Sequence, residues 1–200
     1  MRLGLIRLAG LVAVSTLVGC ATTPPSITDL PADLTQLEHW EARGRIGVSG
    51  GGQGGSGSFD WLQARNRADV QIRGPIGIGS IRLQMSGSAE NPELLLETGN
   101  GQTFQADTAW RELENRLGTR VPAEKLRYWM LGVPAPGEHQ WPEARPDTPP
   151  NNDRAVLEQD GWRIEYRYSD ALSARLPQRI NATSGDARVR IVVDSWSLPR

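Results

Sequence analysis

The sequence predicts a mainly β protein: an antiparallel sheet of roughly ten strands, curled around an apolar interior. The first observation is an alternation of apolar and polar residues with a period of two, which is typical of half-buried strands. In the stretch from Trp162 to Tyr168 the aromatic and aliphatic side chains share one face and the charges share the other. The second observation is turn chemistry between such stretches, with Asp160-Gly161 as the clearest hairpin signal.

Other short stretches repeat the alternation and are predicted as strands. Their apolar positions are Phe59 and Trp61, Val70 and Ile72, Ile81, Leu83 and Met85, Leu94 and Leu96, and Val189, Ile191 and Val193. Turn sequences separate them at Asn91-Pro92, Gly99-Asn100-Gly101 and Ser184-Gly185-Asp186. Strands joined by such short connections pair with their neighbours in antiparallel order.

Helical spacing predicts helices over residues 33–41, 107–117 and 122–131. The second is predicted to be capped by Asp107 or Thr108 and to stop at Gly118, and the third has proline in its first turn and ends at Gly132. Their apolar stripes need cover, and the open mouth of a curled sheet is the nearest apolar surface. We therefore expect a lid of about three helices.

Two segments are predicted as irregular. Residues 133–152 are rich in proline and polar residues and are expected to form a long surface loop with one irregular strand. Residues 50–57 are glycine-rich and are expected to form a mobile hairpin connection.

The amino-terminal segment has the layout of a secretory signal. Arg2 and Arg7 precede an apolar run over residues 8–18, and Gly19 precedes Cys20, the only cysteine of the chain. A bilayer span needs about 20 apolar residues, so this run is too short to be one. The expected divisions are a signal peptide over residues 1–19, a flexible tether over 20–29 and a single domain over 30–200.

Composition argues against several functions. The formal net charge of −1 becomes −3 when Arg2 and Arg7 leave with the signal, and the charges are mixed in sign, so a nucleic-acid partner is not expected. His39 and His139 are far apart in the sequence, which makes a metal site a weak case. We expect no cofactor and no enzymatic activity, although catalysis by a pair of carboxylates stays open at this point.

Two motif matches are rejected on context. Residues 47–51 fit the pattern of a nucleophile elbow and residues 50–55 that of a dinucleotide-binding loop. Both motifs require a strand followed directly by a helix. A second strand is predicted here instead.

The connection Arg73-Gly74-Pro75-Ile76-Gly77-Ile78-Gly79-Ser80 places an aliphatic residue, Ile76, near the tip of a tight hairpin. Polar residues are usual in such turns. Ile76 either folds back onto the core or offers an apolar wedge to a bilayer or a partner groove.

Several short motifs, taken in order, resemble the LolB family of outer-membrane lipoproteins. They are Leu-Val-Gly-Cys ending at Cys20, the stretch 40–44, Pro75-Ile76-Gly77, the stretch 126–134 and Val193-Asp194-Ser195-Trp196. The resemblance covers nearly the whole mature chain. It implies an unclosed antiparallel β-barrel of about 11 strands with a lid of helices over an apolar cavity.

The resemblance also implies a function: a receptor that accepts lipoproteins from a LolA-like periplasmic carrier, holds their acyl chains and inserts them into the outer membrane. It implies acylation of Cys20, location at the periplasmic face of the outer membrane, and an insertion role for Ile76, where the family carries leucine. Outer-membrane lipid and client lipoproteins are the further partners, and a monomer is expected. A rival is a lipoprotein that binds another apolar ligand, or scaffolds envelope assembly, without transfer.

The facing of the predicted elements, rather than the resemblance, selects the candidate lining of the acyl cavity. From the strands it comprises Trp61, Ile72, Leu83, Met85, Leu96, Ile164 and Tyr166, and from the helices Trp110, Leu113, Leu126 and Met130. Leucine, isoleucine, methionine and tryptophan provide an adaptable apolar wall for disordered chains.

Overall fold

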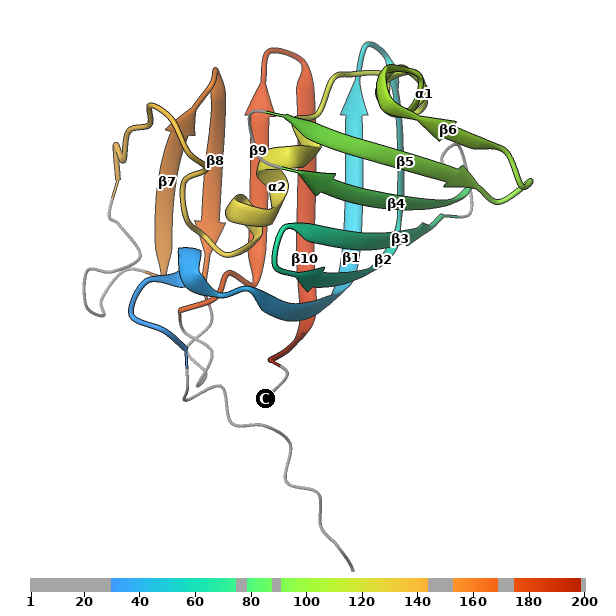
Figure 1. Ribbon diagram of the computed structural model, residues 1–200. Helices are drawn as coiled ribbons and strands as arrows, with labels where there is room; N and C mark the ends of the chain where they lie inside the picture. The colour runs from blue at the N-terminus through green and yellow to red at the C-terminus, as the bar shows by residue number, and fades with distance from the viewer. Residues whose placement is uncertain (1–29, 75–78, 88–90, 144–152, 169–174, 199–200) are drawn as a thin grey trace, which may run out of the picture.

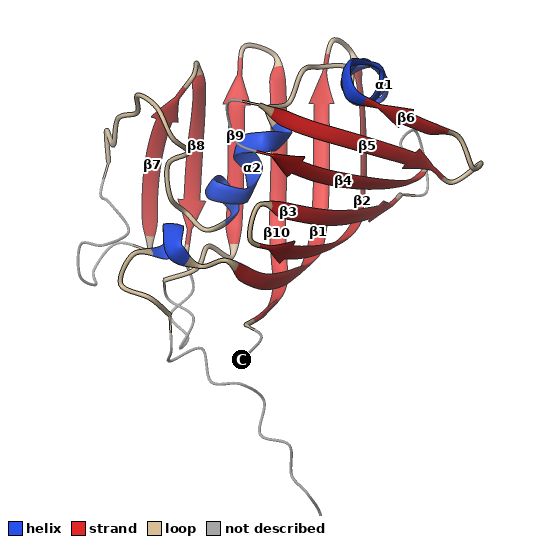
Figure 2. Cartoon of the chain, in the orientation of Figure 1, coloured by secondary structure: helices blue, strands red, loops and turns tan. Residues whose placement is uncertain are grey.

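The protein is described from a computed structural model, which covers residues 30–74, 79–87, 91–143, 153–168 and 175–198. In this part of the chain, ten strands form one antiparallel sheet that curls around a short helix (Figure 1). Figure 2 shows how strongly β structure dominates the molecule. The predicted fold class, an unclosed antiparallel sheet with helices on one face, is confirmed.

The strands follow one another along the sheet with a single change of order. They are β1 (His39–Gly50), β2 (Gln53–Ala64), β3 (Arg67–Arg73), β4 (Ser80–Gly87), β5 (Pro92–Thr98), β6 (Thr103–Gln105), β7 (Arg154–Gln159), β8 (Trp162–Arg167), β9 (Arg179–Ser184) and β10 (Ala187–Ser197). Their order is β6-β5-β4-β3-β2-β1-β10-β9-β8-β7. The first and last strands of the chain therefore pair in the middle, and β6 and β7 form the two edges.

This order places the helices. The chain leaves one edge at β6 and re-enters the sheet at the opposite edge with β7. The connection contains α1 (Ala106–Leu117) and α2 (Ala123–Met130), so it has to cross the mouth of the curled sheet (Figure 1). The lid is a consequence of topology as well as of amphipathic helices.

The alternation read from the sequence sets the core. Along β4 the side chains of Ile81, Leu83 and Met85 are buried, and along β10 those of Val189 and Ile191 are buried, while their neighbours face solvent. The Asp160-Gly161 turn has positive φ at both residues, 51° and 75°, as the predicted tight hairpin requires. The sheet thus has one apolar concave face and one charged convex face.

The seam between β1 and β10 depends on a glycine. The register of the two strands shifts between Arg43 and Gly44, which marks a bulge. A Cβ at Gly44 would lie 2.0 Å from the backbone oxygen of Val192, a distance that no side chain tolerates. On the same strand Trp40 stacks on Trp61 with ring centroids 5.4 Å apart and meets the edge of Trp196, also at 5.4 Å.

The predicted helix over residues 33–41 is wrong. Only a 3₁₀ turn over Leu34–Gln36 forms, with the Asp33 carboxylate accepting a hydrogen bond from the backbone N–H of Thr35 at 2.9 Å. From His39 onward the chain is β1, in which Trp40 and Ala42 are buried and Glu41 between them is not. Leu34, Leu37 and Trp40 have helical spacing, but the chain contacts its core in extended form. The lid in the described residues therefore has two α-helices rather than three.

The prediction that the whole glycine-rich stretch 50–57 is a hairpin connection is also wrong. Only Gly51 and Gly52 form the turn, both with positive φ, and β2 begins at Gln53. Glycine at position 57 permits close backbone approach, because a Cβ there would lie 2.4 Å from the oxygen of Arg73. The glycines that follow Gln53 therefore belong to strand β2 and not to a flexible loop.

The other two helices are confirmed, with one shift. The cap of α1 is Gln105, two residues before Asp107, and Thr108 pairs with it in a capping box; Gly118 ends the helix at φ 70°. The segment after α2 is irregular as far as residue 143, with one β-bridge between Gln140 and Glu158, as predicted.

Candidate functional site: the apolar face beneath α2

The site begins with the reasons that α2 forms where it does. Pro122 fixes the entrance of the helix, and Gly132, with φ 72°, ends it. Leu126, Trp129 and Met130 fall on one side and are buried. The helix therefore presses an apolar stripe onto the concave face of the sheet.

A void lies between this stripe and the sheet. It is lined by apolar side chains from β1 to β4, from β10 and from α2, namely Ile46, Phe59, Trp61, Val70, Ile72, Leu83, Met85, Ala123, Leu126, Met130 and Ile191. No polar side chain lines it, so nothing in the wall demands a hydrogen bond from an occupant. An apolar ligand fits this chemistry, whereas water does not.

The void is small in the state described. Its volume is about 30 Å³. Engineered cavities that bind benzene are about 150 Å³, several times larger. The void thus accommodates a methylene or two, and a whole acyl chain requires α2 to move away from the sheet.

Polar contacts hold one side of α2. The buried side chain of Gln159, on β7, accepts hydrogen bonds from the indole N–H of Trp129 at 3.1 Å and from the backbone N–H of Ala135 at 3.0 Å. Its amide donates to the backbone oxygen of Ala135 at 2.8 Å. In addition, Lys125 forms an ion pair with Asp160 in the β7–β8 turn. We call these contacts the β7 clasp.

The other side of α2 has no equivalent. Within the described ranges, no hydrogen bond or ion pair joins α2 to β2, β3, β4 or β5. There the helix meets the sheet through apolar contacts around Met85 and Ala123. Apolar contact is non-directional and reforms easily, whereas a broken buried hydrogen bond leaves unsatisfied groups. The helix is therefore held at β7 and is separable at β3–β5.

The structure places the predicted cavity residues in two groups. Six line the void: Trp61, Ile72, Leu83, Met85, Leu126 and Met130. The other five lie elsewhere. Leu96 is fully buried on β5, Trp110 and Leu113 border a surface groove between α1 and α2, and Ile164 and Tyr166 are buried on β8.

Five lining residues were not among the candidates: Ile46, Phe59, Val70, Ala123 and Ile191. Phe59 and Val70 had a usable signal, since they share the strand face of Trp61 and Ile72 two residues away. Ile46 and Ile191 are directly paired across the β1–β10 seam. That pairing of the first and last strands is not visible in the local pattern.

The region around Tyr166 is chemically different. Its ring lies 6.3 Å from the rings of both Trp141 and Tyr168. The indole N–H of Trp141 and the hydroxyls of Tyr166 and Tyr168 are buried, and none has a hydrogen-bond partner among the described residues. Burial raises the pKa of the Tyr168 hydroxyl, and burial followed by the neighbouring Tyr168 raises that of Tyr166. We call these three residues the aromatic cluster.

Two predicted functional positions lie outside the described residues. Cys20 is one, and the loop Pro75-Ile76-Gly77 is the other. The residues that flank this loop are described: the backbone N–H of Gly74 donates to the oxygen of Gly79 at 3.0 Å, between β3 and β4. The loop therefore connects the ends of two core strands whose opposite ends lie beneath α2.

The described residues show no sign of two other kinds of site. They contain no group of three or more histidine, cysteine, aspartate or glutamate side chains arranged to hold a metal ion. Neither of the α-helices in that part of the chain combines the length and hydropathy of a membrane span.

Together these features define a class of protein: a half-open antiparallel barrel whose apolar concave face is closed by a helix. Comparison with known proteins makes this specific. Residues 38–196 match the family model described as "Outer membrane lipoprotein LolB". The chain belongs to the LolB family.

Individual relatives agree with this assignment. The chain is 34% identical over 168 residues to the outer-membrane lipoprotein LolB of Pseudomonas fluorescens, which covers 84% of this chain and 78% of that protein. It is 34% identical over 164 residues to the protein of the same name from Pseudomonas aeruginosa, covering 82% and 76%. Among solved structures, a DUF1329 family protein from Desulfovibrio piger aligns with a TM-score of 0.40 at 7% identity, over 82% of this chain and 86% of that one.

Proposed function

We propose that this protein is a receptor at the periplasmic face of the outer membrane. It accepts lipoproteins from a LolA-like periplasmic carrier, holds their acyl chains between α2 and the sheet, and inserts them into the membrane. Membership of the LolB family supports this proposal, as does the name that its relatives carry. The role is carriage, for which the site needs affinity rather than catalytic groups.

The observation that carries the proposal is the wholly apolar void, closed by a helix that is tied down on one side only. Protein interiors are normally filled to close packing, with few voids larger than a water molecule. Here the wall contains flexible residues, Met85 and Met130, that adapt to chains of varied shape. The arrangement suits an interior that opens and closes.

The energy of an acyl ligand is sufficient to open it. Each buried methylene contributes about 0.8 kcal/mol, so roughly ten methylenes contribute about 8 kcal/mol before costs. Lifting α2 from β3–β5 exposes a few apolar side chains, each worth about 1.5–3 kcal/mol. Entry of the chain re-covers the same surfaces, so the net cost of opening is smaller still.

In this proposal Cys20 is the attachment point of the receptor itself. Cleavage before Cys20 would leave an acylated amino terminus, and two or more acyl chains give stable anchoring. Residues 20–29 would then hold the domain near the bilayer. The Ile76 loop would act last, as an apolar wedge that guides the client into the lipid.

Transfer of a lipoprotein from the soluble carrier to vesicles tests the proposal. A carrier loaded with a labelled lipoprotein is mixed with vesicles that contain the acylated receptor or none. We expect the label to move to the vesicles only when the receptor is present. The mature chain with Cys20→Ser, which retains every described residue, should take up a fluorescent acyl probe. Probe uptake without transfer would favour the rival, a lipoprotein that stores an apolar ligand; no uptake would overturn the proposal.

A further inference from the structure

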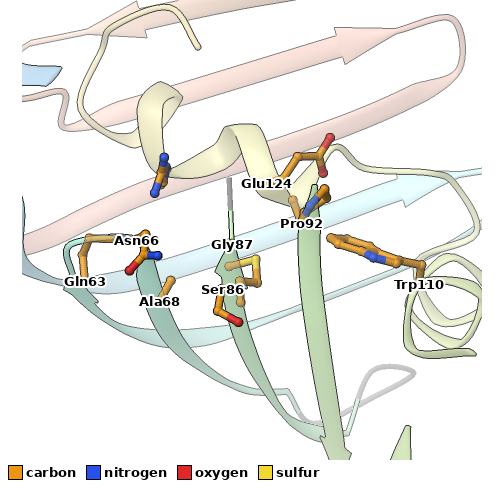
Figure 3. A pocket seen from close by; sticks show the side chains of 11 residues that line it. Gln63, Asn66, Ala68, Ser86, Gly87, Pro92, Trp110 and Glu124 are labelled. Carbon is orange, nitrogen blue, oxygen red and sulfur yellow. The ribbon is translucent and has the colours of Figure 1, made fainter. Parts of the chain in front are cut away.

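A notch opens at the rim of the sheet, on the side of α2 that lies opposite the β7 clasp. Figure 3 shows it between Asn66 and Gln63 at one end and Trp110 at the other, with Glu124 of α2 above. Its lining also includes Ala68, Met85, Ser86, Gly87, Pro92, Ala123 and Arg127. We call it the rim notch; its volume is about 20 Å³.

The rim notch is next to the inner void. Met85 and Ala123 belong to the linings of both. Alanine is small, and methionine is unbranched with three rotatable bonds, so a rotamer change at Met85 alters the separation of the two spaces. The rim notch thus lies where a chain would pass if α2 parted from β3–β5.

Two polar side chains of the rim notch, Arg127 and Asn66, keep N–H donors that no carbonyl or carboxylate of the described residues accepts from. Arg127 has no carboxylate partner within the described ranges: its guanidinium donates to the hydroxyl of the adjacent Tyr128 and lies 4.5 Å from the centre of that ring. The Asn66 amide, in the β2–β3 turn, makes no hydrogen bond there. By contrast, the Gln63 amide is occupied, accepting from Trp61 at 3.1 Å and donating to the oxygen of Arg65 at 2.7 Å.

A larger groove continues outward from these donors. It shares Gln63, Asn66 and Arg127 with the rim notch and extends along Trp40 and Leu131, with a volume of about 350 Å³. An occupant of the rim notch therefore has room to project its polar end away from the void.

We propose that the rim notch binds the polar head of an acylated cysteine, an inference that rests on the proposed function. Such a head carries ester and amide carbonyls, which accept hydrogen bonds and bear no charge. Arg127 and Asn66 donate to these carbonyls, and the hydrocarbon passes Met85 into the interior. Glu124, at the other end of the rim notch, accepts from an amide N–H of the head. The following polypeptide lies in the outward groove.

The test compares two probes on the mature chain with Cys20→Ser. One is a triacyl-cysteinyl peptide, and the other is diphenylhexatriene, a fluorescent hydrocarbon with no hydrogen-bonding group. We expect Arg127→Met to weaken binding of the peptide by about tenfold, the effect of losing a hydrogen bond from a charged donor. Binding of diphenylhexatriene should not change. Arg127→Gln, which keeps N–H donors without the charge, should retain most of the affinity for the peptide.

Matched controls make the outcomes distinct. Arg188→Met removes the same charge from the exposed face of β10 and should leave both probes unaffected. Asn66 lies in an exposed turn. Asn66→Ala should weaken binding of the peptide by about threefold, and this test remains even if Arg127→Met folds poorly. Equal peptide affinity in wild type, Arg127→Met and Asn66→Ala would overturn this inference and leave the proposed function intact. Recovery of peptide binding by Arg127→Lys but not by Arg127→Gln would mean that the contact requires a positive charge rather than a hydrogen bond to a neutral carbonyl, and would also overturn it. Failure of wild type to bind diphenylhexatriene would instead count against the proposed function.

Discussion

The two halves of the sheet handle their interiors in opposite ways. Beneath α2, strands β1 to β4 leave a void whose lining is wholly apolar. At the other end, β7 and β8 contact α2 through the buried Gln159 amide and through rings, with Trp129 and Trp162 6.0 Å apart. At β1 to β4, a ligand that enters beneath α2 displaces only apolar contacts. At β7 and β8, hydrogen bonds fix the helix in place. The difference identifies which half opens and which half holds.

The largest expected effect concerns delivery rather than binding. We predict that Ile76→Glu abolishes insertion of client lipoproteins, because a charged side chain at position 76 would enter hydrocarbon only at a high cost, while uptake of an acyl probe is unchanged. Transfer from a loaded carrier to vesicles measures the first quantity and probe fluorescence the second. Leu62→Glu is the control, since Leu62 is an apolar residue 50% exposed on the convex face. Normal insertion by Ile76→Glu would make the loop a structural feature only.

The second prediction concerns the β7 clasp, which holds one side of α2. Gln159→Leu should lower the free energy of unfolding by about 3 kcal/mol, because the Trp129 indole and the two backbone groups of Ala135 lose their buried partner. Denaturant titration gives the value. Gln140→Leu is the control: its side chain is exposed, and only its backbone bonds to Glu158. Equal effects of the two substitutions would mean that the β7 clasp does not hold α2.

The third prediction concerns a substitution that narrows the void beneath α2. Val70→Ile adds one methylene to a wall of the void, whose volume is only about 30 Å³. We expect the free energy of unfolding to stay level or rise by up to about 1 kcal/mol, because a void is filled. Binding of an acyl probe should weaken. Val189→Ile, the same one-methylene addition at a buried position of β10 outside the void, should instead destabilise the protein by overpacking. Stronger probe binding by Val70→Ile would place the ligand elsewhere.

The smallest expected effect lies in the aromatic cluster. Tyr166→Phe removes a buried hydroxyl that has no partner in the described structure, so stability at neutral pH should be unchanged or higher by about 1 kcal/mol.

The same substitution should alter the response to alkaline pH. Burial raises the pKa of Tyr166 above its unfolded value of about 10, so the folded state keeps its proton where the unfolded state releases it. The folded state is therefore not penalised by Tyr166 below a pH of about 10, and the free energy of unfolding falls as the pH rises beyond it. Unfolding at a series of pH values should show a smaller alkaline loss for Tyr166→Phe. An identical pH profile in both proteins would contradict the assigned burial.

Much of the fold was predictable because it is determined by residues close together in the sequence. Alternation along β4, β8 and β10 and the Asp160-Gly161 turn each follow from neighbouring residues. The helix predicted over residues 33–41 failed because Leu34, Leu37 and Trp40 reach the core from an extended chain. The site was half predictable for a related reason. Facing identified Met85 and Met130, but which buried residues surround a void depends on the β1–β10 pairing and on where α2 crosses the sheet.

Photo-crosslinking tests the central claim most directly. A triacyl-cysteinyl peptide with a photoreactive group midway along an acyl chain is bound to the mature chain with Cys20→Ser, irradiated and mapped by mass spectrometry. The account predicts adducts on Leu83, Met85, Leu126 and Met130, around the void. Adducts confined to Ile164 and Tyr166 on β8, or to the convex face, would contradict it.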